Sequence, residues 1–182
     1  MLTSKRVLLS ATLSGFLCYG LLMLAGEPPA WLPVHGDVLR ALPGLIFGLL
    51  VLQIETRGFG RRIAVIMACG LIWYAAFKLA GFMVADQQKS TLLACGVAGG
   101  LAAWLVSLVV RLIKPRRLSL LAMLMAFVAG TLGGCLIGEA LLESDLMPWT
   151  HALLIAGFIV WQAGVGSAML LVDELGADDP HA

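Results

Sequence analysis

The sequence predicts an all-α polytopic membrane protein, a compact bundle of six transmembrane helices with both termini in the cytoplasm. Three observations lead to this prediction: an apolar composition, six long apolar runs, and basic residues gathered on alternate connectors. The chain of 182 residues is 60% hydrophobic and only 13% charged, against about 25% charged in soluble domains. Its length fits one domain, 1–182. Because one domain cannot hide so much apolar surface from water, we expect the lipid bilayer to surround it.

The six apolar runs define the expected spans. A helix that crosses about 30 Å of hydrocarbon needs roughly 20 apolar residues, and the chain has runs of about that length at residues 7–26, 38–56, 63–85, 91–113, 118–140 and 151–172. The second run has the weakest signal, because Arg40 and Pro43 lie near its start. We expect Pro43 to kink this helix without ending it. Residues 173–182 form a short acidic tail.

The basic residues predict the orientation. Nine of the twelve Lys and Arg residues lie on alternate connectors, namely Lys5, Arg6, Arg57, Arg61, Arg62, Arg111, Lys114, Arg116 and Arg117. Arg40 and Lys89 lie towards the other side, and Lys78 lies inside the third run. The positive-inside rule places the nine basic residues in the cytoplasm. An even number of spans agrees with this, so we expect a multi-pass protein of the cell (cytoplasmic) membrane with both termini inside.

Polar residues within the runs are candidates for a substrate-binding site, because ionisable groups are costly in a membrane. Lys78, in the stretch WYAAFKLAGFMVA, lies about 6 Å outward from the middle of the third run, at 1.5 Å per residue. Its side chain either snorkels to the outer interface or pairs with Glu139 at the end of the fifth run. Tyr74 lies one turn before Lys78, and His151 and Gln162 share one face of the sixth run. In the expected arrangement, Lys78 and Glu139 pair at the outer mouth of a cavity whose wall is lined by Tyr74, His151 and Gln162.

Three tryptophans lie near the middle of their runs. Trp73, Trp104 and Trp161 have packing as their commonest role, and with Gln162 they also have the chemistry to frame an apolar pocket.

Small residues repeat along the fifth and fourth runs. Residues four apart lie on one face of a helix, and a face without side chains lets another backbone approach closely. The pattern predicts helix-packing faces at Ala126, Gly130, Gly134, Gly138, Gly96 and Gly100. Packing inside the bundle is the favoured interpretation, and a contact with a second copy or with another membrane protein subunit is the alternative.

The sequence contains no motif for catalysis, a cofactor or a metal ion. The four cysteines all fall inside apolar runs, and the three histidines are scattered without metal-ligand spacing. We therefore expect no enzyme activity, no cofactor and no metal site. The net charge of +1 leaves no basic surface for nucleic acid.

Two functions remain. The first is a small-solute transport or substrate-binding component of the membrane, which the polar residues at the outer level favour. The alternative is a structural or accessory subunit that packs against another membrane protein through its glycine-rich helix faces.

The expected orientation can be tested by cysteine labelling. With "RGFGRR" in the cytoplasm, a Gly60→Cys variant should resist an impermeant thiol reagent in intact cells, whereas Gln88→Cys on an outer connector should react. The reverse pattern would overturn the orientation and the outer position of the polar residues.

Overall fold

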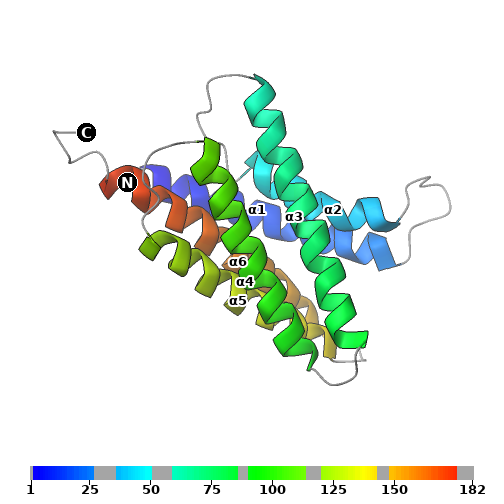
Figure 1. The fold of residues 1–182 in the computed structure, drawn as a ribbon. Helices are drawn as coiled ribbons and strands as arrows, with labels where there is room; N and C mark the ends of the chain where they lie inside the picture. Colours follow the sequence, from blue (N-terminus) through cyan, green and yellow to red (C-terminus); the bar gives the residue numbers. More distant parts are fainter. Residues whose placement is uncertain are drawn as a thin grey trace.

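The computed structural model describes residues 2–26, 36–50, 59–85, 90–113, 120–142 and 148–175. Each of these ranges holds one α-helix, so the described part of the chain is all-helical, as predicted (Figure 1). The helices are α1 (Leu2–Gly26), α2 (Gly36–Leu50), α3 (Phe59–Ala85), α4 (Thr91–Ile113), α5 (Leu120–Leu142) and α6 (Pro148–Leu175).

Four helices in the described ranges are long and apolar enough to cross a membrane, namely Phe59–Ala85, Thr91–Leu112, Leu120–Leu142 and Trp149–Ala168. The apolar segments found in α1 and α2 are shorter, Leu8–Leu21 and Arg40–Leu50. Several predictions fall outside the described residues: residues 51–56 of the second span, residues 118–119 of the fifth span, residues 176–182 of the acidic tail, and the connector positions Gln88 and Lys89.

The helices form a closed ring in sequence order. Each helix packs on the next one along the chain, and α6 returns to pack on α1. Successive helices run in opposite directions, so that α1 begins and α6 ends at the same end of the bundle (Figure 1). We call this the terminal end, and we call the end where α1, α3 and α5 finish the opposite end.

The most extensive contact in the ring joins α4 and α5, and glycines make it possible. A Cβ on Gly130 would lie 2.5 Å from Ala103 Cβ, and one on Gly138 would lie 2.9 Å from Leu92 Cα. A Cβ on Gly134 would meet the backbone carbonyl of Cys95. The two backbones therefore touch along the face that the repeat of small residues predicts. Such contacts hold helices together in lipid, where no hydrophobic effect drives them to associate.

The glycine face of α4 completes the same interface. A Cβ on Gly96 would lie 2.7 Å from the Sγ of Cys135, and Gly100 lies against Thr131 and Phe127. Ala126 of α5 is fully buried. The small-residue faces of α4 and α5 are thus covered by each other.

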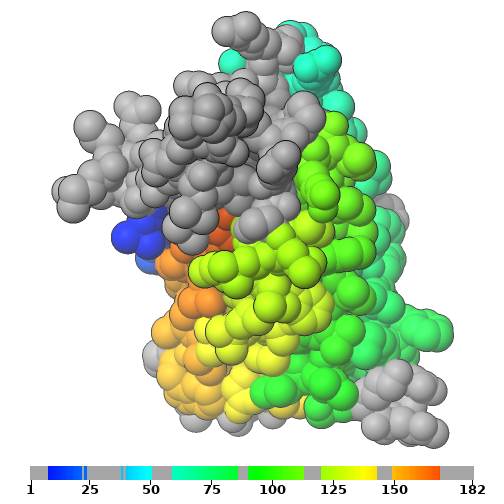
Figure 2. Space-filling view, turned by 60° about the vertical axis from the view of Figure 1, so that its left-hand side comes forward, coloured from blue at the N-terminus to red at the C-terminus, as the bar shows by residue number. Residues whose placement is uncertain are grey.

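The side of α5 next to α6 is also glycine-lined. Figure 2 shows α5, in yellow, between α6 in orange and α4 in green. A Cβ on Gly133 would lie 2.7 Å from both the Gly157 carbonyl oxygen and Trp161 Cβ. Helix α5 is therefore held closely on both sides.

The outer faces of the bundle are apolar. On α3 the side chains of Met67, Leu71 and Phe82 are exposed, and on α5 so are Leu124 and Leu132. Large apolar side chains exposed in rows indicate contact with lipid, because water would penalise so broad an apolar surface.

The glycine contact predicts opposite effects for two matched substitutions. Gly134→Ala adds a Cβ against the Cys95 backbone and should lower the unfolding free energy by about 1–3 kcal/mol. Gly81→Ala adds the same Cβ to α3 where nothing lies within 4 Å. It should leave stability unchanged or raise it by up to about 1 kcal/mol, because alanine favours the helix. Unfolding in mixed micelles followed by circular dichroism measures both; equal effects would refute the backbone contact.

Candidate functional site

A cavity of about 60 Å³ lies inside the ring, between α3, α4, α5 and α6. Its walls include Trp73, Ala76, Phe77 and Ala80 of α3, Cys95 of α4 and Ile137 of α5. Ala102, Gly134 and Trp161 line its deeper part. The lining is almost entirely apolar. We call this space the central cavity.

The central cavity is partly open, and its lining residues differ in burial. Phe77, Ala80, Cys95 and Ile137, which are the lining residues nearest to the opposite end, are half-buried. At the deeper level Ala102 and Trp161 are only 1% and 2% exposed. Ala102 and Trp161 are thus enclosed, whereas Trp73 and Gly99, which contact Trp161, are half-buried.

Trp161 forms the floor of the cavity together with other aromatic rings. Its ring centroid lies 4.9 Å from that of Phe47 and 5.1 Å from that of Trp73, both in edge-to-face geometry. Trp73 also lies 5.6 Å from Phe158. The indole Nε1 of Trp161 donates a hydrogen bond of 3.0 Å to the carbonyl oxygen of Gly99. A buried indole N–H needs such a partner, and this bond ties α6 to α4.

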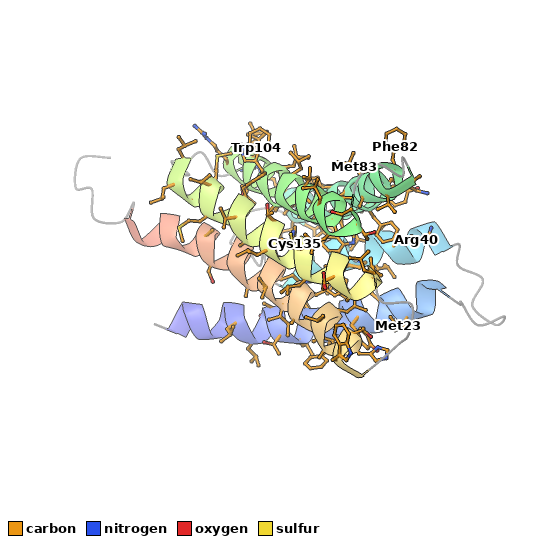
Figure 3. The ribbon with its side chains drawn as sticks, turned by 90° about the horizontal axis from the view of Figure 1, so that it is seen from below. Met23, Arg40, Phe82, Met83, Trp104 and Cys135 are labelled. Atoms are coloured by element: carbon orange, nitrogen blue, oxygen red, sulfur yellow. The ribbon has the colours of Figure 1, made fainter. Side chains whose placement is uncertain are left out.

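Two cations lie close to aromatic rings towards the opposite end. The guanidinium carbon of Arg40 lies 5.4 Å from the ring centroid of Phe77, a residue of the cavity wall. The Nζ of Lys78 lies 5.3 Å from the ring centroid of Tyr74. Figure 3 shows Arg40 of α2 at the same end of the bundle as Phe82 and Met83, in the last turns of α3. Neither cation is among the residues that line the central cavity, and each is stabilised by its cation–π contact with a ring.

A buried cluster of polar side chains lies where α1, α2 and α6 meet. Gln162 is fully buried, and its Nε2 donates to the Sγ of Cys18 at 3.2 Å. The Cys18 thiol in turn lies 3.9 Å from the Pro43 carbonyl oxygen and 4.0 Å from the Oγ of Ser14. Within the described part of the chain, the Oε1 of Gln162 has no hydrogen-bond partner. A buried carbonyl oxygen without a donor is costly, which marks this position as unusual.

His151 is tied to α1 rather than to the cavity. Its Nδ1 lies 2.6 Å from the hydroxyl of Tyr19, and the two rings meet edge to face with centroids 5.7 Å apart. This hydrogen bond joins the end of α1 to the start of α6, across the point where the ring closes.

The five predicted site residues thus fall in separate places. Tyr74 and Lys78 lie together on α3, whereas Gln162 and His151 contact residues of α1. Glu139 is half-buried on α5. It lies two residues after Ile137, which at about 100° per residue puts it on nearly the opposite side of α5 from the cavity wall. The α3–α5 pair is not among the helix pairs that pack extensively, and the Lys78–Glu139 ion pair stays a prediction.

Sequence reasoning anticipated part of the cavity and missed the rest. Trp73 and Trp161 line it, but Trp104 is 41% exposed and points away from the other helices (Figure 3). Cys18 and Tyr19 were missed as partners of Gln162 and His151. Arg40 was noted as a weakness of the second span, although a cation inside an apolar run is itself a signal of function.

A scan of this chain against protein-family models finds no match, and searches of curated proteins and of solved structures find none either. The function must therefore be inferred from the geometry of the residues.

The unpartnered oxygen of Gln162 predicts an unusual substitution effect. Gln162→Leu removes one weak N–H···S contact but also removes a buried acceptor that lacks a donor, which costs about 1–3 kcal/mol. The unfolding free energy should therefore stay the same or rise by about 1 kcal/mol. The control is Phe158→Leu, which removes ring atoms from the aromatic floor and should lower stability by a few kcal/mol. If Gln162→Leu destabilises as much as the control, the carboxamide is a structural requirement.

Proposed function

We propose that the chain is a six-span protein of the cell membrane with both termini in the cytoplasm, and that it binds a small solute in the central cavity as part of a transport or solute-binding system. The observation that carries this proposal is the shape of the cavity. Its lining residues nearest to the opposite end are half-buried and would form a mouth, whereas Ala102 and Trp161 are enclosed at the aromatic floor. Binding sites between the helices of a bundle are typically apolar and concave in this way.

The basic residues support an outward direction for the mouth. The positive-inside rule assigns the terminal end to the cytoplasm, because Lys5 and Arg6 precede the first span and Arg111 ends α4. The mouth of the cavity is at the other end and would face outside. A solute arriving from outside would then meet Phe77 and Ala80 before it reached Trp161.

The five polar residues predicted from the sequence are also part of this proposal. Lys78 and Tyr74 would contribute to the outer rim, and Glu139 would sit at the same level on α5. The His151–Tyr19 bond would hold α1 on α6 beside the rim. Gln162 lies at the depth of the floor, one residue after Trp161, but it is fully buried against α1 and does not line the cavity.

The alternative function, an accessory subunit, is not supported by the glycine faces. That hypothesis relied on the glycine faces of the fourth and fifth spans, and these faces cover each other within the chain. A partner would have to use another face, and no particular contact favours one.

Cys95 offers a native reporter of the cavity. In a variant that keeps Cys95 as its only cysteine, a small charged thiol reagent added to intact cells should modify Cys95 from outside. In the matched variant that keeps only Cys69, which is 1% exposed against α2, the reaction should be slower by on the order of tenfold or more, because the reagent must reach the thiol.

A pair of neighbouring alanines supplies the control for this labelling. Ala76 lines the cavity, whereas Ala75 is exposed on the outside of α3. Ala76→Phe should block the modification of Cys95, and Ala75→Phe should leave it unchanged. Lack of any reaction from outside, or reaction only in inside-out vesicles, would refute an outward cavity.

A further inference from the structure

The walls of the central cavity provide little for a polar solute to bind. None of the described residues that line the cavity carries a charge. The lining side chains that can form a hydrogen bond are the indoles of Trp73 and Trp161 and the thiol of Cys95. The N–H of Trp161 already donates to the Gly99 carbonyl oxygen. A charged group that entered the cavity would lose its water without compensation, whereas an uncharged apolar group would gain by entering.

Small side chains create the cavity. More than half of its lining residues are alanine or glycine, namely Ala76, Ala80, Ala98, Ala102, Gly99 and Gly134. The glycines serve the contact between α4 and α5, since a Cβ on Gly99 would meet the backbone carbonyl of Gly130. Ala76 and Ala80 of α3 are half-buried beside the open space. Such a space costs stability, because the helices forgo contacts that larger side chains would make. Its presence therefore indicates a use other than packing.

The volume limits the size of the solute. The central cavity measures about 60 Å³. An apolar protein cavity of about 150 Å³ stays dry and binds benzene, and the central cavity has less than half of that volume. It has room for a short aliphatic chain, whereas an aromatic ring would force its walls apart.

The helix contacts favour a free molecule over the alkyl chain of a lipid. Each helix that lines the cavity packs on its neighbour in the sequence, α3 on α4, α4 on α5 and α5 on α6. Helix α3 also reaches α6 through the rings of Trp73 and Phe158. A lipid chain would have to pass between packed helices, whereas a free molecule has to pass only the half-buried residues of the lining.

We propose that the solute of the central cavity is a small uncharged aliphatic molecule, smaller than benzene, which packs between the alanines of α3 and the ring of Trp161. This inference rests on the proposed function, since it names the solute class of the same cavity. Charged solutes are excluded by the loss of their hydration, because no described residue of the lining carries a charge that would compensate for it.

Protection of Cys95 tests the proposal. Purified protein with Cys95 as its only cysteine is kept in digitonin, a detergent with a steroid body in place of a long alkyl chain. It is treated at neutral pH with methyl methanethiosulfonate, a small uncharged thiol reagent, in the presence of 1-butanol, butyrate or butylammonium at equal ionic strength. The three probes share their alkyl chain and differ in charge. 1-Butanol should halve the reaction rate at a concentration on the order of tenfold lower than either ion.

A larger probe tests the size limit. Benzyl alcohol has more apolar surface than 1-butanol, so it would protect better if the probes acted by partitioning into the detergent. Binding in the cavity predicts the reverse order. Ile137→Ala enlarges the cavity and should allow benzyl alcohol to protect Cys95. Leu132→Ala, which shortens an exposed side chain on the outer face of α5, should leave the order unchanged.

Two features keep the test decisive. Ile137→Ala is expected to gain protection, and an unfolded variant would not show a gain. The ranking of the four probes is measured on the unaltered lining and needs no variant. The same reaction in a phosphatidylcholine bilayer then distinguishes a free solute from a lipid chain, since 1-butanol should protect Cys95 there as well.

The outcomes separate the solute class from the proposed function. Butyrate or butylammonium that protects as well as 1-butanol, benzyl alcohol that protects better, or no gain with Ile137→Ala overturns the assigned class and leaves the solute cavity standing. If Cys95 reacts but no probe slows the reaction, the class is again overturned. A reaction that is slow in the bilayer, fast in digitonin and unaffected by 1-butanol means that a lipid chain occupies the cavity, which overturns the free solute. If Cys95 does not react at all, the accessible cavity fails and the solute class fails with it.

Discussion

The contacts of Trp161 hold the centre of this bundle together. From α6 its ring meets Phe47 of α2 and Trp73 of α3, and its N–H bonds to a backbone carbonyl of α4. One side chain therefore links four of the six helices. It also closes the central cavity on the side of the terminal end, so the cavity exists only while this side chain keeps its position. A smaller residue would join the cavity to the terminal half of the ring, because neighbouring helices cannot collapse fully around a missing indole.

The walls of the cavity are unequal in how firmly they are held. Helices α4 and α5 touch backbone to backbone at Gly130, Gly134 and Gly138, which leaves no side chains to rearrange. Helix α3 touches α2 backbone to backbone at Gly44 and Gly48, but on its cavity side it packs on α4 and reaches α6 through the rings of Trp73. Aromatic side chains change rotamer more readily than backbones in contact can separate. A change in cavity volume would consequently come from a joint movement of α2 and α3 rather than from α5.

The sequence was sufficient to predict the fold class, but it was not sufficient to predict which polar residues lie together. Apolar runs and glycine spacing depend on local composition, so six helices and the faces of Gly134 and Gly96 followed from the residues alone. The predicted cluster of Lys78, Glu139, Tyr74, His151 and Gln162 depended on which helices face each other. Periodicity fixes the face of a residue on its own helix but not the neighbour of that helix. For this reason the sequence did not predict that Gln162 and His151 would contact Cys18 and Tyr19 of α1.

Gln162 also shows how a cost to stability can point to a function. Its buried oxygen lacks a donor within the described residues, although a leucine would fit an apolar surrounding without that penalty. It follows Trp161 directly on α6, about 100° further around the helix, so any rotation of α6 that displaces the aromatic floor also moves the carboxamide. The hydrogen bond between Gln162 and Cys18 and the floor of the central cavity therefore depend on two adjacent residues of α6, so they would move together. If Trp161 shifts, the groups that surround the Gln162 oxygen change as well.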